Sequence, residues 1–297
     1  MHIPSEMLSG SVCPVTAAIA AGGVAASVYL IYKNKDSMPS ASKFAMVSAA
    51  VFGLQMLNYP IWHGISGHLI GGVFAAAMLG APAAVLSLAI VLLLQTLLFA
   101  DGGLLMLGAN VLNMAILGAG AGGLIRSAML RRSMPDKTAT ALAAFISVEL
   151  AAVALCAELA FSGKGSAQAF LTLIGVHSAL AAFEAVASVL LISLLDRSGE
   201  EVPAKRTLLA LGALVIASVA LSPFACAFPD AFEWTMQTFS MLPEAPNFAN
   251  APFAGYAIAS LSNTALSGIC AGAIGIVSTA AFAYVAARIL CRRATVA

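Results

Sequence analysis

Long apolar runs recur along the whole chain, and they constrain its fold more than any other feature. A helix needs about 20 apolar residues to cross a hydrocarbon core. Hydrophobic residues make up 61% of the chain and charged residues 9%, against about 45–50% and about 25% in soluble proteins. We therefore predict an all-α, polytopic helical membrane protein. Its nine predicted membrane segments are 12–32, 44–59, 68–79, 82–100, 107–125, 139–161, 168–195, 207–227 and 261–287.

The third segment is short and rich in glycine, which is typical of a partial or broken helix lining a cavity. Basic residues indicate the topology, because cytoplasmic loops carry an excess of Lys and Arg. With nine crossings, the clusters at 33–43, 126–137, 197–206 and 288–293 fall on one side, and Lys164 alone falls on the other. We expect a multi-pass protein of a prokaryotic plasma membrane, with the amino terminus outside and the carboxy terminus cytoplasmic.

The first apolar run does not resemble a cleaved signal peptide, because no basic residue precedes it and it exceeds an h-region of about 7–15 residues. We expect it to stay, and the amino terminus with it. The polar stretch DRSGEEVPAKR, residues 196–206, reads as a cytoplasmic linker between a seven-segment core, 1–195, and a two-segment unit, 207–297. A net charge of +1 argues against a nucleic-acid partner. The five cysteines form no CxxC pair, which argues against a disulfide framework or a thiolate metal site.

Two histidines fall at the predicted outer surface in positions suited to metal binding. His2 offers three nitrogens in sequence: the α-amine of Met1, its own amide nitrogen and its imidazole Nδ1. These can close a five-membered and a six-membered chelate ring, and a distant histidine would complete a planar set of four nitrogens. Tetragonal nitrogen coordination suits Ni(II) or Cu(II), whereas Mg²⁺ and Ca²⁺ prefer oxygen. Alternatively, His2 is a polar residue in a flexible tail.

His68 is the candidate for the fourth nitrogen. It lies in the stretch SGHLIGG, whose glycines permit close backbone approach. Alternatively, it is a histidine at a helix start, bonded to a carbonyl. His63 is an alternative ligand, a group next to the ligands, or a surface residue, and we favour the last two.

Other polar residues of the predicted segments have a structural interpretation. His177 and Glu184 are seven residues apart and share one helix face, so we expect hydrogen bonds that hold the bundle together rather than metal contacts. The same interpretation applies to Gln95, Glu149 and Glu158. Asn110 and Asn113 are expected to orient the ligand loop or to cap helix breaks.

Four stretches in order, MHIPSEMLS, QMLNYPIWHGISGHLIGG, LLFADGGLLMLGANVLNM and GVHSALAAFEA, resemble the cobalt/nickel substrate-capture subunits of energy-coupling factor transporters (the CbiM/NikM type). The resemblance covers residues 1–195. It implies a metal site made by the Met1 amine, the His2 amide and imidazole, and His68. It also implies Ni²⁺ or Co²⁺ as the transported ion, no catalytic cofactor, and two kinds of partner: a transmembrane coupling subunit and cytoplasmic ATPases.

The ladder Ala17, Ala21 and Ala25 suits packing against such a membrane partner or within the bundle. The carboxy-terminal unit, with FPDAFEWT at 228–235, resembles the small accessory component (NikN) marked by a Pro-Asp-Gly-Leu-Glu motif, although Ala231 and Phe232 replace the Gly-Leu pair. Because every predicted ligand precedes position 196, we expect residues 1–195 to bind metal without 207–297.

We therefore predict a fused specificity component of an ATP-driven importer for Ni²⁺ or Co²⁺, and not an enzyme. The chain has no GxxxxGK[ST] phosphate loop, so ATP hydrolysis would belong to a partner. The planar nitrogen set favours nickel slightly. One alternative is a stand-alone secondary transporter or channel, for which Glu149, Glu158 and Glu184 offer little. Another is a hydrolase using Ser66 and His68, but two residues apart is poor geometry for nucleophile and base.

Overall fold

The computed structural model describes residues 2–34, 38–195, 204–242 and 251–295. It is a polytopic helical membrane protein, as predicted. Within the described residues, seven helices are long and apolar enough to cross a membrane. They are Val12–Lys33 (α1), Ala81–Phe99 (α4), Leu104–Arg131, Asp136–Phe161 (α7), Ala167–Leu195 (α8), Lys205–Phe224 and Thr264–Cys291.

The second and third predicted segments are shorter as helices than the sequence suggested. Helix α2 spans Ala41–Met56, because the chain then turns into Tyr59-Pro60, and a residue before proline disfavours helical backbone. A small antiparallel hairpin follows, made of β1 (Tyr59–Trp62) and β2 (Ile65–Gly67). Helix α3 then spans only Gly72–Leu79, in keeping with the expected partial helix. The chain thus places irregular backbone at 57–71, beside the buried ends of other helices.

The span Leu104–Arg131 contains a short 3₁₀ turn, Leu104–Met106 (η2), a turn of α-helix, Leu107–Asn110 (α5), a π-helical stretch, Val111–Ala121 (η3), and α6, Gly122–Arg131. Eleven residues of π-helix are unusual, and π geometry inside helices is frequent at functional sites. This stretch packs against α4 and α7 and carries Asn113. Asn110 lies immediately before it.

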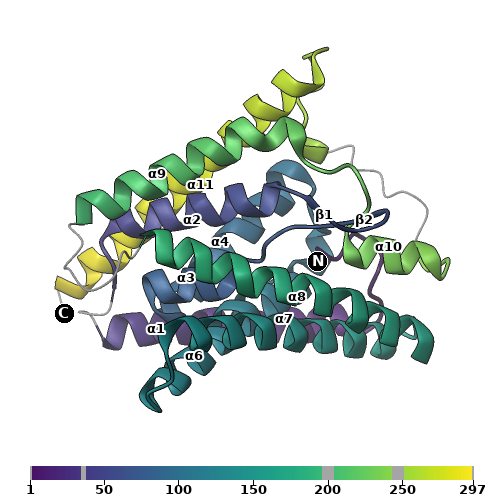
Figure 1. The fold of residues 1–297 in the computed structure, drawn as a ribbon, viewed down its shortest axis with the longest axis horizontal. Coiled ribbons are helices and arrows are strands. Elements are labelled where there is room, and N and C mark those ends of the chain that lie inside the picture. Colours follow the sequence, from purple (N-terminus) through teal and green to yellow (C-terminus); the bar gives the residue numbers. More distant parts are fainter. Residues whose placement is uncertain (1, 35–37, 196–203, 243–250, 296–297) are drawn as a thin grey trace.

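The carboxy-terminal part packs on the core rather than standing apart from it. Its elements are α9 (Ala204–Leu221), η4 (Ser222–Phe224), α10 (Ala231–Thr238), η5 (Ala254–Tyr256) and α11 (Thr264–Thr295). Helices α9 and α11 lie along α2 (Figure 1), and α10 contacts α8 and β2. Most of the predicted linker, residues 196–203, lies outside the described residues.

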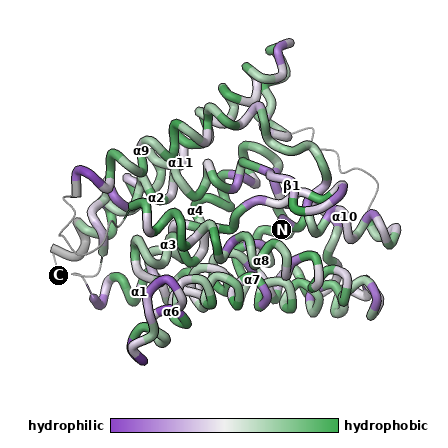
Figure 2. The backbone as a smooth tube through the Cα atoms, viewed as in Figure 1, coloured by the Kyte–Doolittle hydropathy of each residue, from purple (hydrophilic) through white to green (hydrophobic). Residues whose placement is uncertain are grey.

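Hydrophobic residues run along the lengths of the long helices, and hydrophilic residues gather at helix ends and in the connecting segments (Figure 2). The first described residues lie near one end of the bundle, close to the hairpin and α10 (Figure 1). Lys164, in the turn between α7 and α8, donates to the backbone oxygen of Glu6 at 2.6 Å. The amino-terminal segment, the α7–α8 turn, the hairpin and α10 therefore share one end of the molecule.

Candidate metal-binding site

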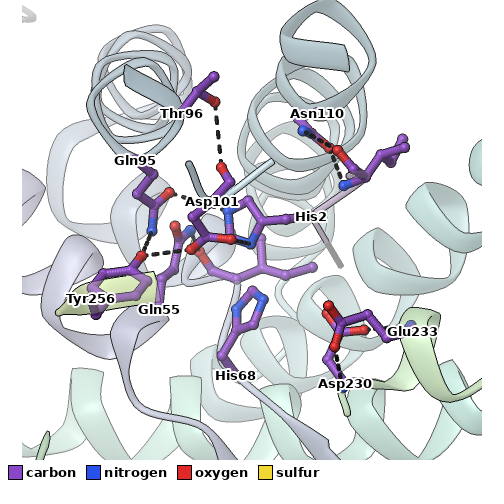
Figure 3. A network of polar contacts seen from close by, with 12 residues as sticks. His2, Gln55, His68, Gln95, Thr96, Asp101, Asn110, Asp230, Glu233 and Tyr256 are labelled. Carbon is purple, nitrogen blue, oxygen red and sulfur yellow. Dashed lines mark hydrogen bonds and ion pairs between the residues drawn. The ribbon is translucent and has the colours of Figure 1, made fainter. Parts of the chain in front are cut away.

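A polar cavity of about 520 Å³ opens at this end of the bundle. One water molecule occupies about 30 Å³ of liquid, so the cavity has room for an ion with part of its hydration shell. Its lining comes from four parts of the chain: the amino-terminal segment, the α2–α3 connection, the end of α4 and the carboxy-terminal unit. Its polar side chains are His2, Gln55, Asn58, His68, Asp101, Asp230, Glu233 and Tyr256, most of them labelled in Figure 3.

His2 is held in the cavity by the backbone of the next residue. The amide nitrogen of Ile3 donates to Asn110 Oδ1 at 2.8 Å, and the Ile3 oxygen accepts from Gly103 N at 3.0 Å. Position 103 requires glycine because the backbone of Ser5 lies very close: a Cβ at this position would be 2.7 Å from the Cα of Ser5. The Ile3 side chain is fully buried. The segment after His2 is therefore seated on the stretch between α4 and η3.

His68 is held by a backbone segment that two helices fix from opposite sides. Glu184 on α8 accepts the amide N–H groups of Ile70 and Gly71, both at 2.8 Å. Gln55 on α2 donates to the Ile70 oxygen, also at 2.8 Å. His68 Nδ1 lies 3.1 Å from the backbone oxygen of Leu69. A hydrogen bond from Nδ1–H to that oxygen places the imidazole lone pair on Nε2, which is how backbone carbonyls orient metal-binding histidines.

The two imidazoles meet inside the cavity, with ring centroids 5.0 Å apart and an interplanar angle of 31°. Both residues are buried, His2 to 8% and His68 to 4% exposure. Burial lowers the pKa of His2, although the Asp101 carboxylate acts to raise it. Burial, together with the neighbouring His2, holds the pKa of His68 well below its usual value. Both rings are therefore neutral at pH 7, which is the form that binds metal.

Three further side chains surround the His2 ring (Figure 3). Its Nδ1 lies 3.3 Å from Asp101 Oδ1, and its Nε2 lies 3.2 Å from Gln95 Oε1. Tyr256 donates from its hydroxyl to Asp101 Oδ2 at 2.6 Å and accepts from Gln95 Nε2 at 3.3 Å. Burial and the Asp101 carboxylate raise the pKa of Tyr256 well above its usual value. The hydroxyl therefore keeps its proton at pH 7.

The carboxy-terminal unit forms one wall of the cavity. Ser66 in β2 donates from its amide to the oxygen of Pro229 at 2.9 Å and from its hydroxyl to the oxygen of Phe228 at 2.6 Å. These bonds bring Asp230 and Glu233, at the start of α10, to the cavity. The two carboxylates form a capping box: Glu233 N donates to Asp230 Oδ1 at 2.8 Å, and Asp230 N donates to Glu233 Oε2 at 3.3 Å.

The candidate residues of the sequence analysis divide into two groups. The structure brings His2 and His68 to the cavity. Asn110 is bonded instead to the backbone of Ile3, and Met1 lies outside the described residues. His63 is exposed at the tip of the hairpin, beside Trp62. It lines a separate surface pocket with β1.

The remaining candidates make structural contacts. Asn113 donates to Glu158 Oε2 at 2.9 Å, deep between η3 and α7. His177 is fully buried, and its Nδ1 lies 2.8 Å from the oxygen of Leu173 on its own helix. Glu184 supports the His68 segment from behind, as described above.

Sequence reasoning missed the second half of the cavity. Asp101 and Asp230 both lay in quoted motifs, LLFADGG and FPDAFEWT, but their side chains were assigned no role. Gln95 was interpreted as a bundle contact, and Tyr256 was not singled out. The predicted ligands all precede position 196, but the cavity lining also includes Asp230, Glu233 and Tyr256 of the carboxy-terminal unit. The sequence did carry a signal for them: acidic residues lie in two predicted outer connections, Asp101 in the first and Asp230 and Glu233 in the second.

The chain matches a family model described as "Cobalt uptake substrate-specific transmembrane region" (CbiM) over residues 2–202. The chain belongs to the CbiM family. A second model, described as the PDGLE domain, matches residues 205–292. Both matches confirm the predicted fusion of a CbiM/NikM-like part with a PDGLE-like accessory part.

Curated relatives are metal transport proteins rather than enzymes. The chain is 38% identical over 162 residues to the putative fused nickel transport protein NikMN of Archaeoglobus fulgidus, covering 54% of this chain and 53% of that protein. It is 30% identical over 177 residues to the cobalt transport protein CbiM of Sorangium cellulosum, covering 58% of this chain and 78% of that protein. The match thus spans about half the length of the Archaeoglobus relative.

Solved structures agree with the fold. A crystal structure titled as a transition metal transporter superposes with a TM-score of 0.58 at 30% identity, covering 66% of this chain and 93% of that one. A truncated transition metal transporter gives the same TM-score and identity, covering 67% of this chain and all of that one. The CbiM-type fold is therefore shared with proteins described as transporting transition metals.

Proposed function

We propose that this CbiM-family protein is the substrate-specificity component of an energy-coupling factor importer, and that it captures Ni²⁺ or Co²⁺ from outside the cell. The observation that carries the proposal is the pair of buried, neutral imidazoles, His2 and His68, with ring centroids 5.0 Å apart in a polar cavity. Carboxylates of Asp101 and Asp230 at the same cavity favour a cation over an anion or an apolar ligand.

The donor chemistry favours a borderline transition metal. Two imidazoles suit Ni²⁺, Co²⁺, Cu²⁺ and Zn²⁺, whereas Mg²⁺ and Ca²⁺ need mostly oxygen ligands. Among the described residues, no group of three or more His, Cys, Asp or Glu side chains is arranged to hold a metal ion by itself. Further nitrogen donors are therefore expected from the backbone, and the Met1 amine and His2 amide of the predicted chelate supply them. A planar nitrogen set of this kind favours nickel.

The partners follow from the family and from an exposed helix face. Ala17, Ala21 and Ala25 all face outward on α1. Ala17 and Ala21 line an apolar groove of about 550 Å³, together with Leu105 and Val111. Small residues of this kind permit close packing of a second membrane helix, which supports a transmembrane coupling subunit there. ATP hydrolysis would then belong to cytoplasmic subunits. The distribution of basic residues predicts an orientation in which the cavity opens to the outside and the carboxy terminus lies in the cytoplasm.

The two rival functions gain no support from the geometry. The Ser66 hydroxyl donates to the Phe228 oxygen rather than to a base, so a Ser66–His68 hydrolase has no activated nucleophile. A proton-coupled secondary transporter needs membrane carboxylates that can exchange protons. Glu184 instead accepts two backbone N–H groups, and Glu158 is bonded to Asn113.

Metal titration of the purified protein tests the proposal. We expect tight binding of Ni²⁺, Co²⁺ or both by isothermal titration calorimetry, and its loss in His2→Ala and in His68→Ala. His63→Ala, at the exposed hairpin tip, is the matched control and should bind as the native protein does. A peptide added before Met1 should also abolish tight binding, whereas the same peptide at the carboxy terminus should not. Native affinity in His68→Ala would refute the proposed site.

A further inference from the structure

A chain of three side chains links the His2 ring to the carboxy-terminal unit. Tyr256 contacts both Asp101 Oδ2 and Gln95 Nε2, and Gln95 Oε1 lies 3.2 Å from His2 Nε2. Gln95 lies in the last part of α4 and Asp101 two residues after its end, whereas Tyr256 belongs to η5 in the unit that matches the PDGLE domain. The chain therefore crosses from one family module to the other (Figure 3).

The direction of every hydrogen bond in this chain follows from its chemistry. An ionised carboxylate only accepts hydrogen bonds, so the Tyr256 hydroxyl gives its one proton to Asp101. The Tyr256 oxygen then accepts from Gln95, and only the amide nitrogen of Gln95 can donate. The Gln95 oxygen is thereby turned toward His2. Gln95 Oε1 therefore faces His2 Nε2 as a hydrogen-bond acceptor.

The other ring nitrogen of His2 also faces an acceptor. His2 Nδ1 lies 3.3 Å from Asp101 Oδ1, and Tyr256 holds the other oxygen of that carboxylate. Tyr256 therefore contacts both acceptors between which the His2 ring lies. Because Nδ1 closes the six-membered chelate ring with the His2 amide, the orientation of the ring decides whether Nδ1 points at the ion.

We propose that Tyr256 is a positioning residue for metal capture: through Gln95 and Asp101 it fixes the orientation of the His2 ring that presents Nδ1 to the ion. The proposal rests on the proposed function of the site. It assigns the carboxy-terminal unit a chemical part in recognition, because without Tyr256 the Gln95 amide loses the partner that sets its orientation.

The position of Tyr256 is itself well fixed. Its ring stacks on Phe99, with centroids 4.7 Å apart and an interplanar angle of 21°, and the neighbouring Phe253 N donates to the oxygen of Leu98 at 2.9 Å. Phe99 is the last residue of α4, two positions before Asp101. The η5 turn is thus docked on the same helix end that presents Gln95 and Asp101.

Tyr256→Phe is the sharpest test, because it keeps the stacked ring and removes only the hydroxyl. Outer hydrogen-bonding partners of metal-binding histidines are worth about 10- to 100-fold in metal affinity. We therefore expect the Kd for Ni²⁺ to rise at least tenfold in calorimetric titration of the full-length protein. Tyr284→Phe, on an exposed position of α11 in the same unit, is the matched control and should leave the Kd unchanged.

The His2 ring signals give a second readout that needs no metal. ¹⁵N spectra of ring-labelled histidine, with the His2 signals assigned by their loss in His2→Ala, report the hydrogen-bonding surroundings of each ring nitrogen. In the metal-free native protein we expect one set of His2 ring signals. In Tyr256→Phe we expect these signals to shift or split, because Gln95 and Asp101 lose the hydroxyl that holds them beside the ring.

Each outcome bears on one claim. Native Ni²⁺ affinity in Tyr256→Phe would overturn the inference, and so would weaker binding with unchanged His2 ring signals, since Tyr256 would then act only as a cover. Absence of Ni²⁺ and Co²⁺ binding in the native protein would instead refute the proposed function, while the ring signals would still judge the hydrogen-bond chain.

Discussion

Substitution of Asn110 tests whether the fixed position of the amino-terminal segment determines metal affinity. Its side chain is 1% exposed and holds both backbone groups of Ile3. Oδ1 accepts from Ile3 N at 2.8 Å, and Nδ2 donates to Ile3 O at 3.4 Å. Asn110→Leu keeps a similar volume and removes both bonds. The Ile3 oxygen retains its bond from Gly103, but the Ile3 N–H loses the partner that it has in the native protein.

The size of the effect follows from that one N–H. A buried donor left without a partner costs about 1–3 kcal/mol, and here the cost falls on the seated conformation of residues 2–5. If binding requires that conformation, the apparent Kd rises as its population falls. A free-energy change of this size corresponds to about 5- to 150-fold in affinity. We therefore expect weaker Ni²⁺ binding within this range, measured by calorimetric titration.

Asn113→Leu is the control, because Asn113 has the same side chain and 1% exposure, and lies three residues farther along the same span. It is bonded to Glu158 and not to the amino-terminal segment. Both variants should melt at a lower temperature, but only Asn110→Leu should lose Ni²⁺ affinity beyond the error of the titration. Equal losses of affinity in the two variants would show that general loosening of the bundle, not the seat of Ile3, controls binding.

Two further substitutions probe the supports of the two histidines. Glu184→Gln leaves one side-chain oxygen for two backbone N–H groups. We expect thermal melting to show a free energy of unfolding lower by about 1–3 kcal/mol, and titration to show weaker Ni²⁺ binding. A native melting temperature would contradict this. Gly103→Ala would place a Cβ 2.7 Å from the Cα of Ser5, so we expect Ni²⁺ binding to be lost. Gly175→Ala, where a Cβ meets nothing within 4 Å, should bind Ni²⁺ normally, and equal binding by both glycine variants would refute the close-packing argument.

The sequence predicts the helices well, because each one is encoded by its own apolar run. It predicts less well where the backbone leaves the helix. The run 44–59 is mostly apolar, yet the helix ends at Met56, since the turn at Tyr59-Pro60 and the hairpin pairing outweigh hydrophobicity there. The eight-residue α3 follows from its glycine boundaries, Gly71 with φ 72° and Gly80 with φ 82°.

For the site, too, the local sequence predicts some residues, whereas other contacts depend on how distant parts of the chain pack. His2 and His68 could be proposed from chemistry and family resemblance, because each stands in a recognisable stretch. The contact of Tyr256 with Asp101 joins residues 155 positions apart, and no periodicity or spacing encodes it. The role of Glu184 was foreseen only as structural. That it binds the backbone of residues 70 and 71 depends on how α8 packs behind the α2–α3 connection.

The cavity changes what should be expected of the carboxy-terminal unit. From sequence, residues 1–195 were expected to bind metal alone, because every predicted ligand lies there. The proposed ligands precede position 196, but Tyr256 accepts a hydrogen bond from Gln95, and Asp230 adds a carboxylate to the cavity lining. A truncated protein would retain both imidazoles, but Gln95 and Asp101 would lose the Tyr256 hydroxyl that holds them beside the His2 ring. If the hydrogen-bond chain acts as proposed, truncation should weaken metal binding without abolishing it. Adding back the separate unit should then restore native affinity, which would show that the loss comes from the missing contact with that unit.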